Sequence, residues 1–254
     1  MSGKRKPRIL LTNDDGIGAA GIMALYKAVK GIGEVTIVAP DSERSAVGHA
    51  ITLSDPLRVK QINAYSYQTT GTPADCVKLA VRAILKYKPD LVISGINLGP
   101  NTGYSVLYSG TVSGATEGVI LGIPSIAVSL GTFTDPDYSV AAQYAKKIAL
   151  KVLKEGLPKG ILLNVNVLAV PKSKIKGIKI TRQSKKAFIE RFDRRIDPHG
   201  RIYYWLTGEV IDLEGEQGSD IDAINKGYVS ITPLHCDMTE FAFMEEMKGW
   251  ESLK

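Results

Sequence analysis

Arg-Ile-Leu-Leu-Thr-Asn-Asp-Asp-Gly, residues 8–16, joins an apolar run to two adjacent carboxylates. The run Ile9–Leu11 predicts a buried strand of a parallel sheet. Ligands of open α/β sheets bind at the carboxyl ends of the strands, so we expect Asp14 and Asp15 at the mouth of a site. Neighbouring carboxylates repel each other, and a divalent cation offsets this because hard ions prefer oxygen ligands. The stretch therefore predicts a metal-dependent site built on the first strand.

Strand and helix patterns alternate from this stretch to about residue 170. Buried strands are expected at residues 8–13, 34–39, 90–94, 124–130 and 161–167, with helices between them at 19–30, 73–87, 109–121 and 138–154. Residues 51–70 alternate apolar and polar side chains, which favours an antiparallel excursion. The order predicts an α/β fold with a doubly wound, mostly parallel sheet.

The character of the chain changes after Pro171. Charged, loop-like segments surround short strand patterns at 177–181 and 201–206, which indicates a β-hairpin arm. A last strand at 228–232 and a terminal amphipathic helix at 238–248 follow. We therefore divide the chain into a catalytic core, residues 1–170, and an oligomerisation region, residues 171–254.

Composition is that of an ordinary globular protein. The chain has 254 residues, 44% hydrophobic and 23% charged, and no apolar run long enough to cross a bilayer. Only two cysteines occur, Cys76 and Cys236, and they are too far apart in the sequence to suggest a zinc pair. A chain of this size needs no disulfide bond, so the low cysteine count favours a reducing, cytoplasmic compartment. We expect no membrane partner.

Positive charge is concentrated in one segment. The net charge is +6, but residues 172–201 alone carry 11 Lys or Arg and three acidic residues. A solvated basic arm is the simpler interpretation, and a phosphate-rich partner such as nucleic acid is the alternative. We do not expect a nucleic acid partner.

A dinucleotide fingerprint competes with the metal hypothesis. Gly16-Ile17-Gly18-Ala19-Ala20-Gly21 matches G-x-G-x-x-G between a strand and a helix, and Asp41 follows at a suitable distance. A pyrophosphate on this turn would lie beside Asp14 and Asp15, which would repel it. The glycines are alternatively explained by close packing of the helix on the sheet.

Polar residues follow the strands at the same sheet edge and complete the predicted metal site. Asp14, Asp15, Ser45 and Asn97 offer two carboxylates, a hydroxyl and an amide oxygen. Such an all-oxygen set favours Mg²⁺ or Mn²⁺ over zinc, which usually takes His or Cys.

A phosphate pocket is predicted opposite these ligands. Small and hydroxyl residues at a helix start bind anions well, and we expect the phosphate to be held by Asn101, Ser109, Gly110 and Thr111. The alternative for Ser109 is a plain N-cap. Two roles are considered for His49, which lies close to Ser45 in the sequence: a general acid or a phosphate contact.

Six motifs together resemble one family. They are Ile-Leu-Leu-Thr-Asn-Asp-Asp-Gly at 9–16, Val-Ala-Pro-Asp-Ser-Glu-Arg-Ser at 38–45, Thr-Gly-Thr-Pro-Ala-Asp-Cys-Val at 70–77, Ser-Gly-Ile-Asn-Leu-Gly-Pro-Asn at 94–101, Ser-Gly-Thr-Val-Ser-Gly-Ala at 109–115 and Tyr-Val-Ser-Ile-Thr-Pro at 228–233. In this order they resemble the SurE family, the stationary-phase survival proteins that act as 5′-nucleotidases.

The resemblance implies a cytoplasmic, divalent-metal-dependent phosphatase of nucleoside 5′-monophosphates, with 3′-nucleotides and short polyphosphate as further substrates. It implies a Rossmann-like core and one Mg²⁺ or Mn²⁺ per subunit on Asp14, Asp15, Ser45 and Asn97. Asp14, Asp15 and Asn97 are the expected catalytic residues. The resemblance also implies a homodimer or homotetramer with an exchanged C-terminal arm.

Overall fold

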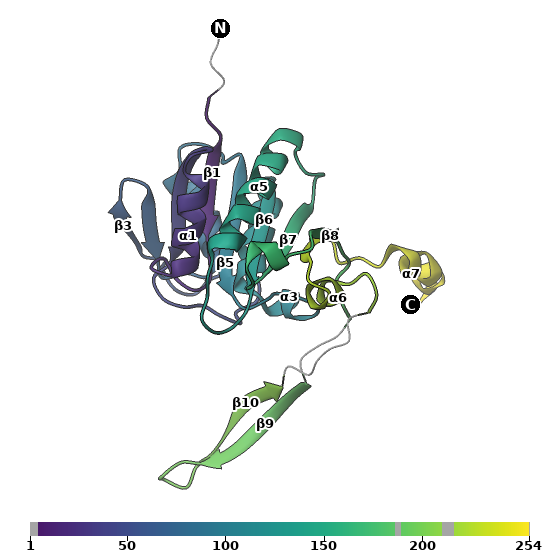
Figure 1. Cartoon of the computed structure of the whole chain (residues 1–254). Coiled ribbons are helices and arrows are strands. Elements are labelled where there is room, and N and C mark those ends of the chain that lie inside the picture. The colour runs from purple at the N-terminus through teal and green to yellow at the C-terminus, as the bar shows by residue number, and fades with distance from the viewer. Residues whose placement is uncertain (1–4, 186–188, 210–215, 254) are drawn as a thin grey trace.

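A single large sheet runs through the protein. The computed structural model describes residues 5–185, 189–209 and 216–253. From one edge to the other, the strands of the sheet are β3 (Val59–Asn63), β4 (Ser66–Thr69), β2 (Glu34–Pro40), β1 (Arg8–Thr12), β5 (Leu91–Leu98), β6 (Ser125–Gly131), β7 (Ile161–Leu168), β11 (Val229–His235) and β8 (Ile178–Ile180). The predicted α/β fold is confirmed (Figure 1).

The centre of the sheet is parallel. β1 pairs in parallel with both β2 and β5, and β5, β6 and β7 continue in the same direction. The chain therefore moves outward in opposite directions from β1, first to β2 and later to β5. This reversal creates a switch point at the carboxyl ends of β1 and β5, where ligands of such sheets bind.

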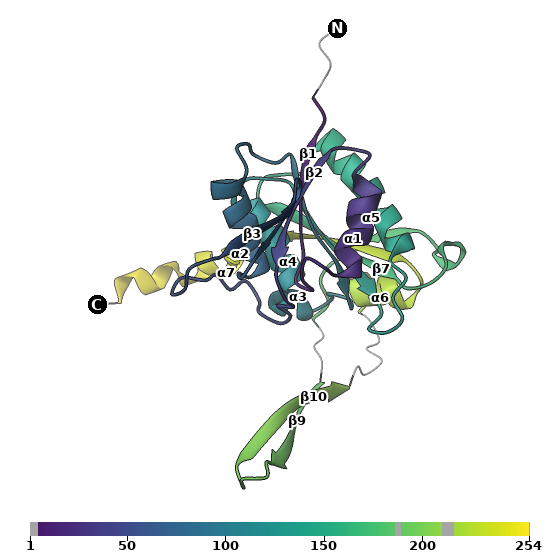
Figure 2. The same ribbon diagram turned by 90° about the vertical axis from the view of Figure 1, so that its left-hand side faces the viewer.

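Helices cover both faces of the sheet. α1 (Ala20–Val29) and α5 (Ser139–Glu155) pack together on one face, and α2 (Pro73–Leu79) and α4 (Gly110–Ile120) on the other. Figure 2 shows the sheet between the two pairs. No helix among the described residues is long and apolar enough to cross a membrane.

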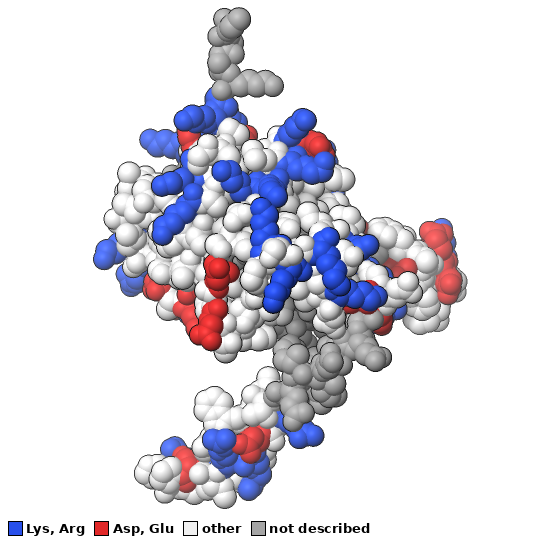
Figure 3. All heavy atoms as spheres, in the orientation of Figure 1, with Lys and Arg blue, Asp and Glu red and all other residues white. Residues whose placement is uncertain are grey.

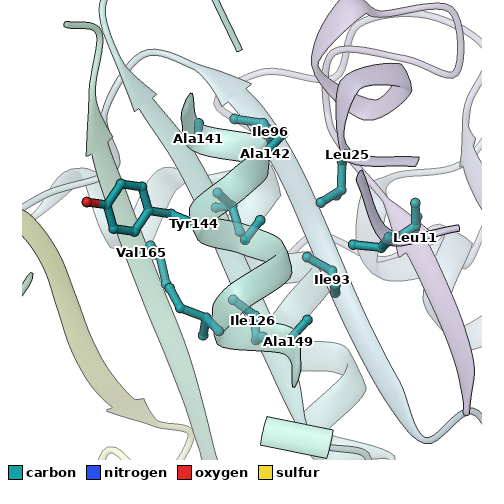
Figure 4. Close-up of a cluster of buried hydrophobic side chains, with 14 of the residues drawn as sticks. Leu11, Leu25, Ile93, Ile96, Ile126, Ala141, Ala142, Tyr144, Ala149 and Val165 are labelled. Atoms are coloured by element: carbon teal, nitrogen blue, oxygen red, sulfur yellow. The ribbon is translucent and has the colours of Figure 1, made fainter. Parts of the chain in front are cut away.

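The larger core lies between α5 and the sheet. Figure 4 shows Ala141, Ala142 and Ala149 of α5 facing strand residues such as Ile93 and Ile126, all of which are buried. The small side chains bring the helix close to the strands, and the β-branched strand residues fill the space beneath it. The sheet is thus a rigid base for the loops at its carboxyl edge.

The helix that starts at Thr72 is shorter than predicted. The Thr72 hydroxyl accepts from the backbone N–H of Asp75, and the Asp75 carboxylate accepts from the N–H of Thr72, which completes a capping box. The helix continues as the π-helical turn η1 (Ala80–Ile84), and Leu85 is already extended. Ile84 and Leu85 pack against the buried cluster that contains Cys76 and Val77. The helical segment therefore ends three residues before the predicted end at Tyr87.

The region after residue 170 has two parts with different surroundings. β8 and β11 continue the main sheet, β11 running antiparallel to β7. α6 (Asp220–Asn225) packs on β11, and the 3₁₀ turn η2 (Lys172–Lys174) precedes β8. β9 (Ile189–Ile196) and β10 (Ile202–Glu209) form the hairpin that extends from the main body (Figures 1 and 2). The division at residue 170 stays a prediction.

The predicted terminal helix consists of α7 (Phe241–Glu246) and the 3₁₀ helix η3 (Met247–Ser252). It begins three residues later than expected, because Glu240 is extended and caps the first turn by accepting from the N–H of Ala242. The helix projects from the main body (Figure 1) and leaves its apolar side chains exposed.

The basic segment is partly balanced within the hairpin. Arg195 pairs with Asp193 at 2.7 Å and Arg201 with Asp197 at 2.8 Å. Figure 3 shows acidic side chains among the basic ones of the hairpin, and further Lys and Arg spread over the main body. Residues 186–188 of this segment lie outside the described residues.

Candidate active site

The loop after β1 holds Asp14 in a fixed, buried position. The Asn13 amide donates to the carbonyl of Gly16 at 2.9 Å and closes the turn. The carbonyl of Asp14 accepts from the backbone N–H of Arg44 at 2.7 Å, which joins this turn to the loop after β2. The Asp14 side chain is 4% exposed. The backbone therefore positions this carboxylate before any ligand arrives.

The start of α4 approaches Asp14 directly. Ser109 is the N-cap, and its hydroxyl accepts from the N–H of Val112 at 3.0 Å. The Thr111 hydroxyl donates to Asp14 Oδ1. A Cβ at Gly110 would lie 2.8 Å from the Asp14 Cβ, so only glycine permits this approach. The N-cap interpretation of Ser109 is confirmed, while a phosphate contact from the same residue stays a prediction.

The electrostatics of the two carboxylates are unfavourable without a cation. Burial raises the pKa of Asp14, although the hydrogen bond from Thr111 opposes this. Burial, together with the charges of Asp14 and Glu43, raises the pKa of Asp15 to about 6. Asp15 Oδ2 is buried and has no hydrogen-bond partner among the residues that the structure describes. An acceptor left in this way costs free energy that a cation would recover.

Ser45 lies on the exposed loop after β2. Its hydroxyl donates to Glu43 Oε1 at 2.6 Å. Glu43 lines the same cavity as Ser45, Asp14 and Asp15, and thus adds a third carboxylate to the cavity lining.

Asn97 is directed by an irregularity in β5. The register between β5 and β6 shifts between Gly95 and Asn97. The Asn97 amide nitrogen donates to the carbonyls of Gly99 at 2.8 Å and Leu98 at 3.2 Å. Because the nitrogen is used in this way, the Oδ1 oxygen is the atom left for a cation.

Asn101 is fixed by buried polar residues of neighbouring strands. Its amide donates to the Ser129 hydroxyl at 2.8 Å, and its backbone N–H donates to Asn166 Oδ1 at 2.8 Å. Its carbonyl accepts from the amides of Asn164 at 2.8 Å and Asn166 at 3.0 Å. Asp220 of α6 accepts from the N–H of Gly103 at 2.9 Å. The loop after β5 is thus held from β6, β7 and α6.

These loops surround one cavity of about 460 Å³. Its lining contains six of the eight predicted site residues and several that were not predicted. The lining residues are Asp14, Asp15, Glu43, Ser45, Ala46, Asn97, Leu98, Gly99, Pro100, Asn101, Ser105, Tyr108, Ser109 and Phe133. Gly110 and Thr111 are buried and contact Asp14 behind this lining.

His49 is not among the lining residues and contacts a residue of α4 instead. Its Nε2 lies 3.0 Å from Glu117 Oε2. Glu117 belongs to α4, is 2% exposed and also pairs with Lys78 of α2 at 3.3 Å. Although burial opposes it, contact with His49 and Lys78 lowers the pKa of Glu117. His49 thereby connects the loop that carries Ser45 to a buried carboxylate.

The glycines of the fingerprint differ in what surrounds them, and Gly21 is the one in close packing. A Cβ at Gly21 would lie 2.0 Å from the carbonyl oxygen of Ile96, so α1 contacts the backbone of β5 at this point. Gly16 has a φ of +96°, which allows the tight turn before α1. The close-packing explanation of the motif is therefore confirmed at Gly21. Cys76 is fully buried, and burial raises the pKa of its thiol.

The oxygen-rich lining fits a hard divalent cation. Two carboxylates with raised pKa values, one carrying an unpaired buried oxygen, lie with a hydroxyl and an amide around one cavity. Among the described residues, no group of three His, Cys, Asp or Glu side chains is arranged to hold a metal. A cation here would thus need hydroxyl, amide or water oxygens as well, as Mg²⁺ and Mn²⁺ commonly do.

Comparison with known families agrees with the motifs. A family model described as Survival protein SurE matches residues 9–190. The chain belongs to the SurE family. The resemblance drawn from the motifs is confirmed, and the six motifs of this SurE chain occur mostly at the carboxyl edge of its sheet.

Relatives cover nearly the whole chain. A Syntrophobacter fumaroxidans protein named 5′-nucleotidase SurE is 48% identical over 247 residues, covering 96% of this chain and 99% of its own. A Symbiobacterium thermophilum protein of the same name is 51% identical over 249 residues, covering 95% and 97%. The crystal structure of the SurE protein from Aquifex aeolicus superposes with a TM-score of 0.88 at 48% identity, covering 96% and 100%.

The roles of several residues around the SurE site were not predicted from the sequence. Glu43 belongs to the motif at 38–45, and its position two residues before Ser45 was the signal that could have indicated it. Asn164 and Asn166 were visible as polar residues in a buried strand, but their partner, Asn101, is more than sixty positions away. Phe133 lies in a loop with no motif.

Proposed function

We propose that this SurE-family protein is a divalent-metal-dependent phosphatase that hydrolyses nucleoside 5′-monophosphates to nucleoside and phosphate. The observation that carries the proposal is the pairing of buried Asp14 and its neighbour Asp15 with the N-terminus of α4. Carboxylates suit a cation, and the N–H groups of a helix start suit a phosphate. The name 5′-nucleotidase of close relatives supports the same activity.

The cation ligands in this proposal are Asp14, Asp15, Ser45 and Asn97. A divalent cation bound there supplies charge for a phosphoryl oxygen and lowers the pKa of water. We propose Mg²⁺ or Mn²⁺, one per subunit, because the donor atoms are oxygens. The Ser45 hydroxyl donates its proton to Glu43 in the structure, so the lone pairs of its oxygen are the part that would bind the ion.

The phosphate would lie between these ligands and α4. The backbone N–H groups of Gly110 and Thr111 belong to the first helical turn, which lacks acceptors within the helix. Asn101 and Ser109 line the cavity beside them. Hydrolysis joins a water oxygen to phosphorus, breaks the bond from phosphorus to the ester oxygen, and leaves a proton on the nucleoside hydroxyl. Asp14, Asp15 and Asn97 are the proposed catalytic residues.

The same site would also accept 3′-nucleotides and short polyphosphate, because both present a terminal phosphoryl group to α4. The cavity is open enough for either, with Ser45 and Tyr108 at exposed positions. We further propose a cytoplasmic location, consistent with two cysteines that are not paired.

We propose a homodimer or homotetramer formed through the region after residue 170. The hairpin and the terminal helices expose large apolar side chains such as Phe192, Trp205, Phe241 and Trp250, each more than half exposed. Exposed apolar surface of this kind is typical of subunit contacts. Light scattering of the purified protein tests this directly, and a monomer would contradict it.

Phosphate release tests the activity. We expect release from 5′-nucleoside monophosphates with Mn²⁺ or Mg²⁺ and none with chelator. The same panel should include 3′-monophosphates and tripolyphosphate to define the range. A Mn²⁺ titration followed by thermal unfolding measures binding separately from turnover. Release that persists in chelator would contradict the metal dependence, and no release under any condition would contradict the proposed activity.

A further inference from the structure

Two exposed aromatic side chains stand at the rim of the site cavity. Phe133 is 58% exposed and Tyr108 is 62% exposed, and both line the cavity that contains Asp14 and Asp15. Neither ring can bind a metal or a phosphate through its apolar surface. Large apolar groups at the rim of a polar cavity are instead typical of sites that bind a ligand with an apolar or aromatic part.

Phe133 is held in place by the loop that carries Asn97. A Cβ at Gly99 would lie 2.4 Å from the Phe133 Cε1 atom, so the ring rests on the bare backbone of Gly99. The N–H of Gly99 donates to the carbonyl of Leu130 at 3.1 Å, and its carbonyl accepts from the Asn97 amide at 2.8 Å. The ring is thus connected to the proposed cation ligand Asn97 through one residue.

The loop around Phe133 is itself ordered by hydrogen bonds. The Thr132 hydroxyl donates to the carbonyl of Thr134 at 2.8 Å and accepts from its N–H at 3.2 Å. These bonds bridge the two neighbours of Phe133. With one side of the ring supported by Gly99 and more than half of the side chain exposed, a flat surface is available to a ligand.

Tyr108 stands on the phosphate side of the cavity. It ends α3 (Ser105–Tyr108) and directly precedes Ser109, the N-cap of α4. Its carbonyl accepts from the N–H of Gly48 at 3.0 Å, which connects it to the loop of Ser45. The two rings therefore come from different segments, the loop after β6 and the short helix α3, and both border the same cavity.

We propose that Phe133 is the stacking surface for the nucleobase and that Tyr108 borders the same subsite, so that this rim selects nucleotides over simple phosphate esters. This inference rests on the proposed nucleotidase function. A nucleobase has a flat π-face, and stacking on an aromatic side chain binds every base without reading its edge. Purines offer a larger face than pyrimidines, so the contribution is greatest for purine nucleotides.

The variant Phe133→Ala tests the proposal by comparing three substrates in the presence of Mn²⁺. They are adenosine 5′-monophosphate, uridine 5′-monophosphate and ribose 5-phosphate, which has no base. We expect the ratio of kcat/KM for adenosine monophosphate to that for ribose 5-phosphate to fall about 5- to 150-fold, the range expected for one lost stacking contact. The ratio for uridine monophosphate falls less. Phe133→Tyr retains most of the selectivity because it keeps a ring.

Leu150→Ala is the matched control. Leu150 lies on α5, is 47% exposed and is not among the cavity residues, so its truncation removes a similar exposed apolar group elsewhere. We expect this variant to keep the wild-type substrate ratios. Thermal unfolding of all variants checks that the fold is kept, and size-exclusion chromatography checks their mass.

Three outcomes would overturn the inference while leaving the nucleotidase function intact. An equal loss for all three substrates would assign Phe133 to the support of Asn97. Unchanged ratios would place the base elsewhere. A changed oligomer mass with unchanged ratios would make Phe133 a subunit contact. If the wild-type protein released phosphate from ribose 5-phosphate and from no nucleotide, the proposed function itself would fail.

Discussion

The hydroxyl of Thr111 donates a hydrogen bond to Oδ1 of Asp14, and Thr111 is fully buried. The bond joins the first turn of α4, the proposed phosphate seat, to a proposed cation ligand. It also opposes the rise that burial causes in the pKa of Asp14. The two halves of the site, the anion side and the cation side, are therefore connected by one side-chain contact.

Thr111→Val removes this bond while keeping the shape of the side chain. We expect Mn²⁺ affinity to fall about 10- to 100-fold, the usual effect of losing a partner that orients a ligand. Asp14 then holds its proton to higher pH, because the bond that stabilises its charged form is absent. Calorimetric titration with Mn²⁺ measures the change. Thr111→Ser, which keeps the hydroxyl, should restore most of the affinity, and an unchanged affinity in the Val variant would contradict the role given to this bond.

Asp14→Asn should abolish turnover and leave the fold intact. The Asn oxygen still accepts from Thr111, but the negative charge that attracts the cation is lost. We expect phosphate release to fall at least about 100-fold, since loss of a ligand costs more than loss of its supporting partner. Asp55→Asn, at an exposed position outside the cavity lining, is the matched control. Turnover like that of the wild type in Asp14→Asn would refute the cation site.

The raised pKa of the Asp15 carboxyl group leads us to expect that cation binding depends on pH. With a pKa of about 6, its carboxyl is mostly protonated at pH 5 and mostly ionised at pH 7.5. Protons compete with the cation, so we expect Mn²⁺ affinity to be about tenfold weaker at pH 5 than at pH 7.5. Asp15→Asn should bind Mn²⁺ weakly and show a smaller pH dependence, with the part due to Asp14 remaining. Affinity that is independent of pH in the wild type would contradict the prediction.

Ionisation of the Asp15 carboxyl group strengthens cation binding, but it lowers the stability of the folded protein when no cation is present. Its pKa is raised above the value of 3.8 for an unperturbed Asp, so ionisation is disfavoured in the folded state. The resulting destabilisation is absent below about pH 4, grows as the pH rises towards 6 and is complete above it. In chelator at pH 7.5, Asp15→Asn should be more stable than the wild type by about 1–2 kcal/mol, allowing for solvent screening. Urea unfolding at pH 4 and 7.5 measures the difference.

The ends of the strands were predictable because topology brings them together. Asp14 follows β1 and Asn97 ends β5, and neighbouring parallel strands with diverging connections must place these ends at one switch point. The buried support was not predictable in the same way. Asn164 and Asn166 bond to Asn101, and this pairing depends on the relative placement of β7 and the loop after β5. Local sequence patterns carry no such information.

We expect the buried Glu117 of α4 to anchor the loop of Ser45 through its contact with His49. Its carboxylate contacts His49 and Lys78, and its pKa is lowered. The stabilisation is therefore present above the ordinary Glu pKa of 4.5 and is lost as the pH falls below it. Glu117→Gln should lower the free energy of unfolding by about 1–3 kcal/mol at pH 7, and the difference should shrink near pH 4. Urea unfolding at both values tests this.

Glu155→Gln serves as the control for Glu117→Gln. Glu155 pairs with Lys151 at the exposed end of α5, and such surface pairs contribute about 0–1 kcal/mol. A loss in Glu117→Gln no larger than in this control would contradict the anchoring role.

Gly21 separates the two interpretations of the glycine motif. In Gly21→Ala the new methyl group would meet the Ile96 carbonyl oxygen at 2.0 Å, and neither backbone can move without separating α1 from β5. We expect a destabilisation of at least about 2 kcal/mol, because overpacking against a backbone is not relieved by a side-chain rotation. Gly18→Ala, where a Cβ meets no atom within 4 Å, should be close to neutral. If the motif instead bound a dinucleotide, NAD⁺ would raise the melting temperature of the wild type, and both variants would weaken that shift. We expect no shift with NAD⁺ and a clear shift with Mn²⁺, because carboxylates at the end of β1 attract a cation and repel a pyrophosphate.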